Sequence, residues 1–306
     1  MSLVIVGSVA FDALETPFGK TDRIIGGAAT YASLTAAYFV EPVQLVAVVG
    51  GDFPQEKIDL FAARGIDLEG LQIKEGEKSF FWSGRYHSDM NSRDTLVTEL
   101  NVLADFDPVL PTAYRSTEYV LLGNLTPAVQ ARVLDQMERR PKLAVLDTMN
   151  FWMDVALDEL KAVIARVDVL SINDSEARQL SGEYSLVKAA KKIMAMGPNV
   201  LVIKKGEHGA LLFKGERVFF APALPLEEVF DPTGAGDVFA GGFAGYLAKT
   251  DDTSFENMKR AVVYGSAMAS FCVEKFGTER LVGLSQEEIS RRVRSFVDLV
   301  DCPMHV

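Results

Sequence analysis

The sequence predicts an α/β fold: a doubly wound, mostly parallel sheet flanked by helices, with a small β-sheet lid beside it. Three observations predict this fold. Short apolar runs rich in β-branched residues recur along the chain, stretches with helical periodicity separate most of them, and one segment has the period-two pattern of a half-exposed sheet. Continuous apolar strands that alternate with amphipathic helices indicate a parallel sheet that is buried on both faces.

The first apolar run ends at Gly7, as expected for a buried strand that enters a loop. The predicted strands of the parallel sheet are Leu3–Val6, Val43–Val49, Tyr119–Leu122, Leu143–Leu146, Val167–Ile172 and Val200–Ile203. The helices predicted between them are Thr30–Phe39, Ala128–Arg139, Val155–Arg166 and Leu186–Met196.

The last third of the chain changes character. Ala210–Phe213 and Arg217–Phe220 are separated by Lys214-Gly215-Glu216, which predicts a β-hairpin. Three helices are expected to follow, at about 235–249, 254–274 and 285–299. The last of them begins with Ser285-Gln-Glu-Glu288, a capping-box pattern that fixes its first residue.

Residues 78–102 differ from the rest because aromatic and polar side chains alternate there, with Phe80, Phe81, Trp82 and Tyr86 near the start. Alternation with period two favours strands with one exposed face. We therefore expect a small sheet that projects as a lid, formed by residues of about 12–24 and 78–102. The chain has no repeats, low-complexity runs or linker-like segments, so it is predicted to form a single domain over residues 1–306.

Composition excludes several classes of function. The 306 residues include 31 basic and 42 acidic side chains, and the net charge of −11 argues against a nucleic-acid or anionic-membrane partner. Two cysteines, Cys272 and Cys302, exclude a disulfide framework, and the three histidines lack zinc-ligand spacing. No apolar run approaches the ~18 residues of a membrane span. These features together predict a cytoplasmic protein.

The segment with the clearest chemistry is Asp231-Pro-Thr-Gly-Ala-Gly-Asp237. Gly234-Ala235-Gly236 leaves the backbone almost bare just before a helix, where free N–H groups and the helix dipole form an anion site. Asp237 follows in the first helical turn. An anion site beside a carboxylate base is what phosphoryl transfer requires. The structural alternative is a Gly-rich turn whose Asp complements the helix dipole; no Gly-Lys-Ser/Thr follows, so the segment is not a Walker A loop.

The string that ends at Asp237 resembles the C-terminal signature of the ribokinase-like, phosphofructokinase-B family of sugar and nucleoside kinases. The resemblance extends over essentially the whole chain. It implies a ribokinase-like fold, with Asp237 as the general base and with Gly234, Ala235 and Gly236 as the anion hole.

Further matches lie near the N-terminus, where the resemblance implies the acceptor site. Gly7-Ser-Val-Ala-Phe-Asp12 is similar to the family's loop after the first strand, whose Asp binds acceptor hydroxyls. Gly26-Gly27 is similar to the double glycine that admits the acceptor and helps to hinge the lid. Tyr31 stands where the family often has an acceptor-binding Asn, which leaves the identity of the acceptor open.

The middle of the chain holds the matches to the family's nucleotide site. Asn173-Asp-Ser-Glu176 resembles the Asn-x-x-Glu motif, which positions phosphate and magnesium partly through water, and it also has the pattern of a capping box. Lys204-Lys-Gly-Glu-His-Gly209 resembles the turn that closes over the nucleotide. The residues assigned to the nucleotide by the resemblance are Asn173, Glu176, Lys204, Gly206, Gly209 and Thr233.

The function predicted from the resemblance is ATP-dependent phosphorylation of a hydroxyl on a small sugar. The alternatives are a nucleoside (adenosine-like) kinase and a non-catalytic regulator that binds a sugar or nucleotide. A Rossmann-type dehydrogenase is disfavoured because no GxGxxG follows the first strand. The implied cofactors are ATP and Mg²⁺, with K⁺ near the Asp231 loop as a family possibility. The aromatic lid residues either stack on the acceptor or form a homodimer clasp, and Arg85 and Arg93 either reach an anionic acceptor or are simply solvated.

Overall fold

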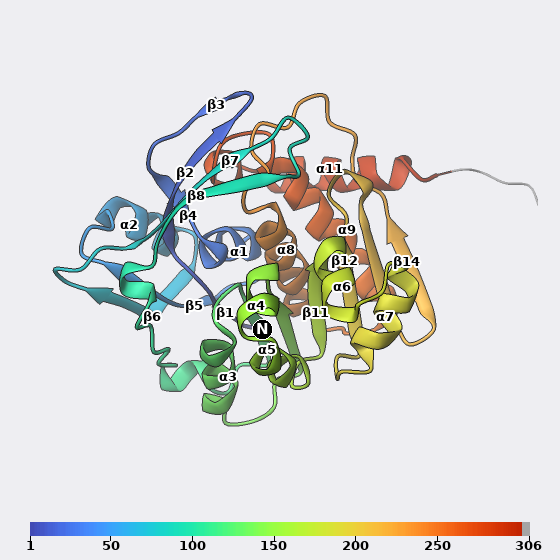
Figure 1. The fold of residues 1–306 in the computed structure, drawn as a ribbon, viewed down its shortest axis with the longest axis horizontal. Helices are drawn as coiled ribbons and strands as arrows, with labels where there is room; N and C mark the ends of the chain where they lie inside the picture. Colours follow the sequence, from blue (N-terminus) through green and yellow to red (C-terminus); the bar gives the residue numbers. More distant parts are fainter. Residues whose placement is uncertain (302–306) are drawn as a thin grey trace, which may run out of the picture.

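The computed structural model describes residues 1–301, so Cys302 and His305 lie outside the described residues. Nine strands form the main sheet in the order β14-β13-β12-β11-β10-β9-β1-β5-β6 (Figure 1). The seven strands from β12 to β6 run parallel, and β13 and β14 add an antiparallel hairpin at one edge. The strands are β1 (Leu3–Val6), β5 (Val43–Gly50), β6 (Ile66–Lys74), β9 (Tyr119–Leu122), β10 (Leu143–Asp147), β11 (Val169–Asn173), β12 (Val200–Lys204), β13 (Ala210–Lys214) and β14 (Arg217–Ala221).

Helices cover both faces of this sheet because alternate side chains of its buried strands point to opposite sides. Leu3 and Ile5 of β1 face one core, and Val4 and Val6 face the other. The first core includes residues of α1 (Ala28–Ala36), α2 (Gln55–Ala63), α8 (Ala235–Thr250) and α9 (Phe255–Cys272). The second includes residues of α3 (Pro127–Gln136), α4 (Asn150–Val155), α5 (Leu157–Ile164), α6 (Asp174–Ser181) and α7 (Leu186–Met194). The helices α10 (Glu279–Val282) and α11 (Gln286–Asp298) pack outside α9.

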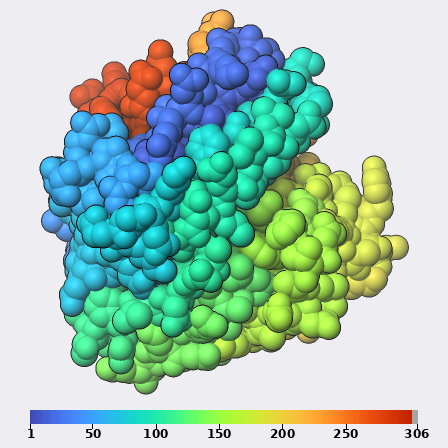
Figure 2. All heavy atoms as spheres, turned by 60° about the vertical axis from the view of Figure 1, so that its left-hand side comes forward, coloured from blue at the N-terminus to red at the C-terminus, as the bar shows by residue number. Residues whose placement is uncertain are grey.

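A separate five-stranded sheet forms the lid, which overhangs the green and yellow part of the surface with a hollow between them (Figure 2). Its strands are β2 (Ala10–Thr16), β3 (Gly19–Lys20), β4 (Ile24–Gly26), β7 (Phe80–Tyr86) and β8 (Arg93–Glu99). The central pair, β2 and β7, is parallel, and β8 is antiparallel to β7. Every residue of β8 is exposed. The α/β fold with a mostly parallel sheet and a small second sheet is therefore confirmed.

Several elements differ from the sequence prediction. The chain beyond Gly7 is not only a loop, because β2 begins at Ala10 and carries Asp12 within the lid sheet. The strand β6 and the helix α2 were not predicted, since the apolar residues of Ile66–Lys74 are spaced too irregularly to indicate a buried strand. The predicted helix Val155–Arg166 is preceded by α4 and begins at Leu157. The capping box at Ser285 is present, and it starts α11.

No helix within residues 1–301 has both the length and the apolar composition needed to cross a bilayer. Cys272 is a buried free thiol on α9.

Candidate active site

The candidate site lies at the carboxyl edge of the main sheet. The chain runs from β1 outward to β5 and β6, and then returns to the other side of β1 through β9, so the strand order reverses between β1 and β9. In open α/β sheets, ligands bind outside the carboxyl ends of the strands at such a reversal. On the β9 side of this reversal, three neighbouring strands end at the same edge in polar residues: Asp147 on β10, Asn173 on β11 and Lys204 on β12.

The lid places Asp12 above this edge, where it lies against Gly26 on the neighbouring strand β4. A Cβ built on Gly26 would lie 1.8 Å from Oδ2 of Asp12, so only glycine leaves room for the carboxylate. Gly27 precedes α1 as its N-cap, with φ +93°. Asp12 is 4% exposed, and burial raises its pKa to about 7, with further contributions from the charges of Asp231 and Asp237. Asp12 and the double glycine therefore form one packed unit.

Tyr31 of α1 lies beneath the glycine loop. A Cβ on Gly234, which has φ +75°, would lie 2.5 Å from three atoms of the Tyr31 ring. The ring thus supports the backbone of Gly234 from below, and any side chain there would displace it. Tyr31 is 1% exposed, and its hydroxyl has no hydrogen-bond partner among the described residues. This residue connects the acceptor side, through α1, to the anion loop.

The glycine loop has the form of an anion site. Ala235 is the first residue of α8, and its N–H donates to the carbonyl of Pro232 at 3.2 Å. Within residues 1–301, the N–H groups of Gly234 and Gly236 have no such acceptor. The donors available to an anion are therefore those of the two glycines, while the Ala235 N–H closes the turn. Free N–H groups at a helix N-terminus are suited to binding a phosphate.

Asp231 fixes the shape of this loop. It is fully buried, and its two carboxylate oxygens accept the N–H groups of Thr233 at 2.9 Å and of Gly277 at 2.8 Å. The hydroxyl of Thr233 donates to the phenol oxygen of Tyr86 at 3.1 Å. Tyr86 belongs to β7, so this contact joins the lid directly to the anion loop.

A buried ion pair lies on the other side of the glycines. Nζ of Lys204 is 2.7 Å from Oδ2 of Asp147, and a Cβ built on Gly236 would lie 3.1 Å from the same Nζ. Although burial opposes it, the charges of Asp147 and Glu176 raise the pKa of Lys204 above its ordinary value. The lysine is therefore charged at neutral pH, and it is held beside the backbone that is free to bind an anion.

Asn173 and Glu176 form a complete capping box at the start of α6. Oδ1 of Asn173 accepts the N–H of Glu176 at 2.8 Å, and Oε2 of Glu176 accepts the N–H of Asn173 at 2.7 Å. Burial raises the pKa of Glu176 to about 7 against the nearby charge of Lys204. The cap explains part of the motif, but a cap on an exposed helix needs no buried carboxylate near a lysine.

Asp237 stands in the first turn of α8, and its side chain is half-buried. Desolvation and the charge of Asp147 raise its pKa to about 7, while Lys204 and Arg93 oppose that shift. A general base is most effective when its pKa is near the working pH. The environment of Asp237 therefore suits proton transfer near neutrality.

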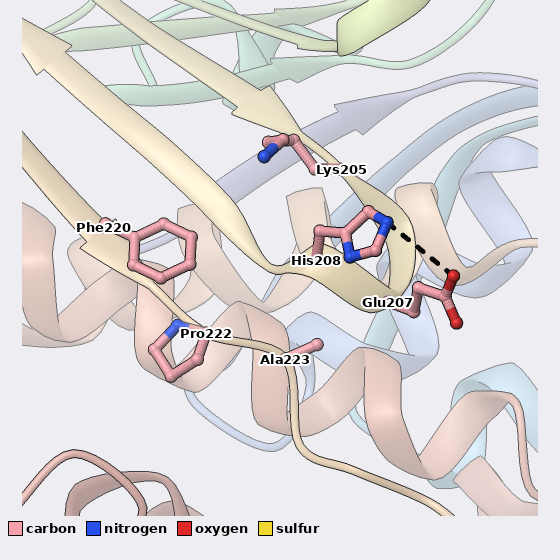
Figure 3. Close-up of a pocket in the computed structure, with 6 residues that line it drawn as sticks. All are labelled: Lys205, Glu207, His208, Phe220, Pro222 and Ala223. Carbon is pink, nitrogen blue, oxygen red and sulfur yellow. Dashed lines mark ion pairs between the residues drawn. The ribbon is translucent and has the colours of Figure 1, made fainter.

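Gly206 and Gly209 shape the turn between β12 and β13, with φ +53° and +84°. Beside this turn lies an open pocket of about 360 Å³, drawn in Figure 3. It is lined by Lys205, Glu207, His208, Phe220, Pro222 and Ala223. Phe220 is half exposed on β14, so an apolar ring faces solvent next to the turn. The pocket is therefore suited to a flat, partly apolar group.

The residues present fit a nucleoside triphosphate with magnesium. The glycine N–H groups and Lys204 offer donors and positive charge to phosphate oxygens, and Glu176 and Asp147 lie nearby. Within residues 1–301, no three His, Cys, Asp or Glu side chains converge as a preformed metal site. Mg²⁺ keeps several waters and is often held by phosphates with few carboxylates, so this donor set suits a metal that arrives with its nucleotide.

Sequence reasoning missed Asp147 and did not separate Arg93 from Arg85. Asp147 is the last residue of an apolar strand, and a carboxylate at the carboxyl end of a parallel strand is a signal that could have revealed it. The face on which each arginine lies depends on strand register, which the sequence of the lid does not fix.

The sheet, the lid and the anion loop with its adjacent carboxylate define a ribokinase-like phosphotransferase. The fold is similar to that of the nucleoside kinase from Methanocaldococcus jannaschii, with a TM-score of 0.77, 19% identity and coverage of 96% of this chain and 98% of that one. It is also similar to aminoimidazole riboside kinase from Salmonella enterica, with a TM-score of 0.76, 20% identity and coverage of 96% and 100%.

The profile of the pfkB family of carbohydrate kinases matches residues 3–282, and the chain belongs to this family. Members of the family transfer a phosphoryl group to an alcohol and use ATP with Mg²⁺.

Named relatives divide between nucleoside and sugar kinases. The cytidine kinase of Thermococcus kodakarensis is 32% identical over 253 residues, which cover 80% of this chain and 88% of the relative. The nucleoside kinase of Methanothermobacter thermautotrophicus is 27% identical over 94% of both chains. A ribokinase of Lactococcus lactis is 24% identical over 90% of this chain and 91% of the relative.

Proposed function

We propose that this kinase transfers the terminal phosphoryl group of ATP to a hydroxyl of a nucleoside. The observation that carries the proposal is the pairing of Asp12 with Trp82 in the lid. The two residues are direct partners in the parallel β2–β7 register, so their side chains lie on the same face. Tyr86 shares that face and contacts the anion loop, which orients the face toward Asp237.

The pair offers two kinds of contact to an acceptor. The Asp12 carboxylate can accept hydrogen bonds from two vicinal ribose hydroxyls. The Trp82 ring lies over the backbone of Gly84, where a Cβ would come within 2.2 Å of it. The ring is therefore held flat by the lid itself, next to the residue that binds hydroxyls. A flat aromatic ring beside a hydroxyl clamp suits a ribose that carries a base.

Several residues of the chain have separate roles in phosphoryl transfer. Asp237 accepts the proton of the attacking hydroxyl, and the N–H groups of Gly234 and Gly236 donate to the oxygens of the moving phosphoryl group. Lys204 adds a positive charge from the sheet side, and Asp147 holds its Nζ in place. ATP, bound with Mg²⁺, supplies the phosphoryl group. We assign the adenine to the pocket beside Phe220, which accounts for an exposed phenyl ring there.

Asn173 and Glu176 are assigned to the phosphates and the magnesium ion, in part through water, in addition to their capping role. Thr233, Gly206 and Gly209 shape the loops on either side of the nucleotide. Gly26 and Gly27 leave room for the acceptor, and Tyr31 acts from beneath by supporting Gly234. A K⁺ site near the Asp231 loop stays a prediction; the two carboxylate oxygens of Asp231 each accept one backbone N–H group.

A bare sugar is the second candidate, and it was the acceptor preferred from the sequence. The ribokinase relatives and the hydroxyl clamp at Asp12 favour it. A bare sugar carries no base to stack on the Trp82 ring. The cytidine kinase relative, 32% identical over 80% of this chain, and the nucleoside kinase relative, 27% identical over 94% of it, also favour the nucleoside.

An assay of ATP consumption with cytidine, adenosine, inosine and ribose tests the proposal. We expect turnover with at least one nucleoside and a much lower kcat/KM with ribose. Base stacking is worth about 1–3 kcal/mol, so Trp82→Ala should raise the KM of the nucleoside about 5- to 150-fold, and Trp82→Phe should raise it less. The KM of ribose should change little in either variant. Preference for ribose, or a nucleoside KM that Trp82→Ala leaves unchanged, would contradict the nucleoside assignment. If ATP is not consumed with any of the four compounds, the result would favour a non-catalytic regulator.

A further inference from the structure

The β7–β8 hairpin of the lid spans the candidate site and touches both of its sides. On one side, Tyr86 at the end of β7 accepts the hydroxyl of Thr233 in the anion loop. On the other, the turn of the hairpin reaches the β12–β13 turn, where a Cβ on Gly206 would lie 3.0 Å from Oδ1 of Asn91. Figure 1 shows β7 and β8 running above the sheet toward β12. The first residue of β8 therefore lies between two contacts that bracket the site.

That residue is Arg93, and it faces the site. In the antiparallel register it is the direct partner of Tyr86, so both side chains lie on the same face of the lid. Its guanidinium carbon lies 5.8 Å from the centre of the Trp82 ring, which is on this face as well. Within residues 1–301, no carboxylate oxygen lies within 4.0 Å of Arg93. Its charge is close enough to lower the pKa values of Asp237 and Glu176.

Arg85 provides a natural contrast on the same hairpin. It is the neighbour of Tyr86 on β7, so its side chain points to the opposite face of the lid. There its Nε lies 3.1 Å from Oε1 of Glu15 on β2. The two arginines belong to one small sheet, yet Arg85 pairs with Glu15 on one face, whereas Arg93 on the opposite face has no ion-pair partner within residues 1–301.

The charge of the site explains why a free cation is needed there. The charge of Asp147 raises the pKa values of Glu176 and Asp237, the charge of Asp237 raises that of Asp12, and Lys204 already pairs with Asp147. A triphosphate adds more negative charge to this space. Bringing these groups together requires positive charge that is not already neutralised.

We propose that Arg93 is a lid-borne phosphate-binding residue that stabilises the phosphoryl group during transfer. This inference rests on the proposed kinase function. In the transfer step, the acceptor oxygen forms a bond to the terminal phosphorus, the bond between that phosphorus and the bridging oxygen of ADP breaks, and the acceptor proton goes to Asp237. The Arg93 guanidinium donates to the phosphoryl oxygens while charge is redistributed among them. Its planar fork can make two such bonds at once.

The location of the cation on the lid has a consequence for water exclusion. Because the lid supplies Arg93, the complete set of phosphate donors exists only when the hairpin lies across the site. The interaction is then strongest when water is excluded, since charges interact more strongly at low dielectric.

The test compares Arg93→Gln with the matched control Arg85→Gln. Removing a preorganised donor to transferring charge typically costs about 10²–10³-fold in kcat, and more for an arginine that meets a phosphoryl group. We expect Arg93→Gln to lower kcat at least about 100-fold and Arg93→Lys to lower it less. Arg85→Gln should stay within about threefold of wild type. In calorimetry with Mg²⁺ and a non-hydrolysable ATP analogue, we expect the Kd to rise about tenfold for Arg93→Gln only.

A second measurement distinguishes the loss of the guanidinium group from the loss of lid structure. In Arg93→Ala, added guanidinium ion should restore part of the turnover and of the analogue affinity, and the same ion should do nothing for Arg85→Ala. Equal behaviour of the two glutamine variants, or an effect of Arg93→Gln on acceptor KM alone, would overturn the inference. Failure of the proposed function has a different signature: wild-type protein would phosphorylate none of the acceptors, while the calorimetric comparison would still show whether Arg93 binds phosphate.

Discussion

The main sheet has a carboxyl edge, where its parallel strands end, and an amino edge, where they begin. Charged residues are solvated differently at these two edges. At the carboxyl edge, Asp12, Glu176 and Asp237 are largely withdrawn from water, and each has its pKa raised to about 7. At the amino edge, the ion pairs stand in solvent: Arg140 is 67% exposed where it meets Asp168 at 2.9 Å. The amino edge also has a cavity of about 350 Å³, close to the volume of the pocket beside Phe220. Cavity size does not distinguish the two edges, but the ionisation of their carboxylates does.

The comparison shows where this fold places carboxylates whose ionisation is unfavourable. Collecting several carboxylates in a poorly hydrated space opposes their ionisation, and the charges of Lys204 and Arg93 offset part of that cost at Asp237. Strongly perturbed pKa values in a cleft are typical of functional sites. The amino edge shows what the same residue types do where stability alone decides: they pair at the surface and add little.

The largest expected effect is on turnover, through Asp237. Asp237→Asn keeps the shape of the side chain and removes the proton acceptor, and a general base typically contributes about 10²–10⁴-fold. We expect kcat to fall by that factor while the affinity for a non-hydrolysable ATP analogue stays within a few-fold of wild type. Retention of more than about a tenth of the wild-type kcat would show that Asp237 is not the base.

The second prediction separates stability from catalysis in the Lys204–Asp147 pair. Lys204→Met leaves the Asp147 carboxylate buried without its partner, and breaking a buried pair in this way typically costs about 3–5 kcal/mol. Adding Asp147→Asn should restore most of the free energy of unfolding, because the buried charge is gone. Turnover should stay low in the double variant, since no ammonium then lies beside Gly236.

Urea unfolding and steady-state kinetics of the two single variants and the double variant test this. Recovery of turnover along with stability in the double variant would assign the pair a purely structural role.

The third prediction concerns pH. Asp12 has a folded-state pKa of about 7 against an ordinary value of 3.8, so between these values the folded protein binds more protons than the unfolded chain. The stability linked to this group is therefore fully present below about pH 4 and is lost as pH rises through 7. Urea unfolding at pH 5 and pH 8 should show a smaller loss for Asp12→Asn than for wild type. An identical pH dependence in the two proteins would contradict the raised pKa.

Activity should increase with pH over the range in which stability decreases, because the pKa of Asp237 is also raised by its surroundings. Asp237 accepts a proton only when it is ionised, so kcat/KM should decline as pH falls below about 7.

The carboxyl edge also shows what a sequence can reveal. The apolar strands and the helices between them follow from local patterns, and the glycine string with Asp237 follows from the needs of an anion site. The packing of Gly26 against Asp12, of Tyr31 against Gly234 and of Lys204 beside Gly236 depends on contacts between segments far apart in the chain. No local pattern encodes those contacts. The capping box at Asn173 shows the converse, because a local signal correctly predicted the helix start without showing that Glu176 is buried beside Lys204.

The smallest expected effect lies at the amino edge, at Asp251. This residue ends α8 in the left-handed region, with φ +51°, and its Oδ1 accepts the phenol of Tyr119 at 2.8 Å and pairs with Lys142. Lys142 and the Tyr119 hydroxyl lower the pKa of Asp251, so at neutral pH it is a normal, solvated carboxylate. Asp251→Asn keeps both an acceptor for Tyr119 and the tolerance of the left-handed conformation. We expect it to change Tm by less than about 2 °C, because exposed ion pairs contribute little.

Asp251→Ala should lower Tm further than Asp251→Asn, because alanine has neither an acceptor nor a side chain that eases the left-handed backbone. Neither variant should change kcat or the nucleotide affinity by more than about twofold, since both lie at the opposite edge of the sheet from Asp237 and Lys204. Thermal unfolding and steady-state kinetics of the two variants check this. A change in kcat comparable to that of a carboxyl-edge variant would show that the two edges are coupled, and the contrast between a functional edge and a merely stabilising one would then fail.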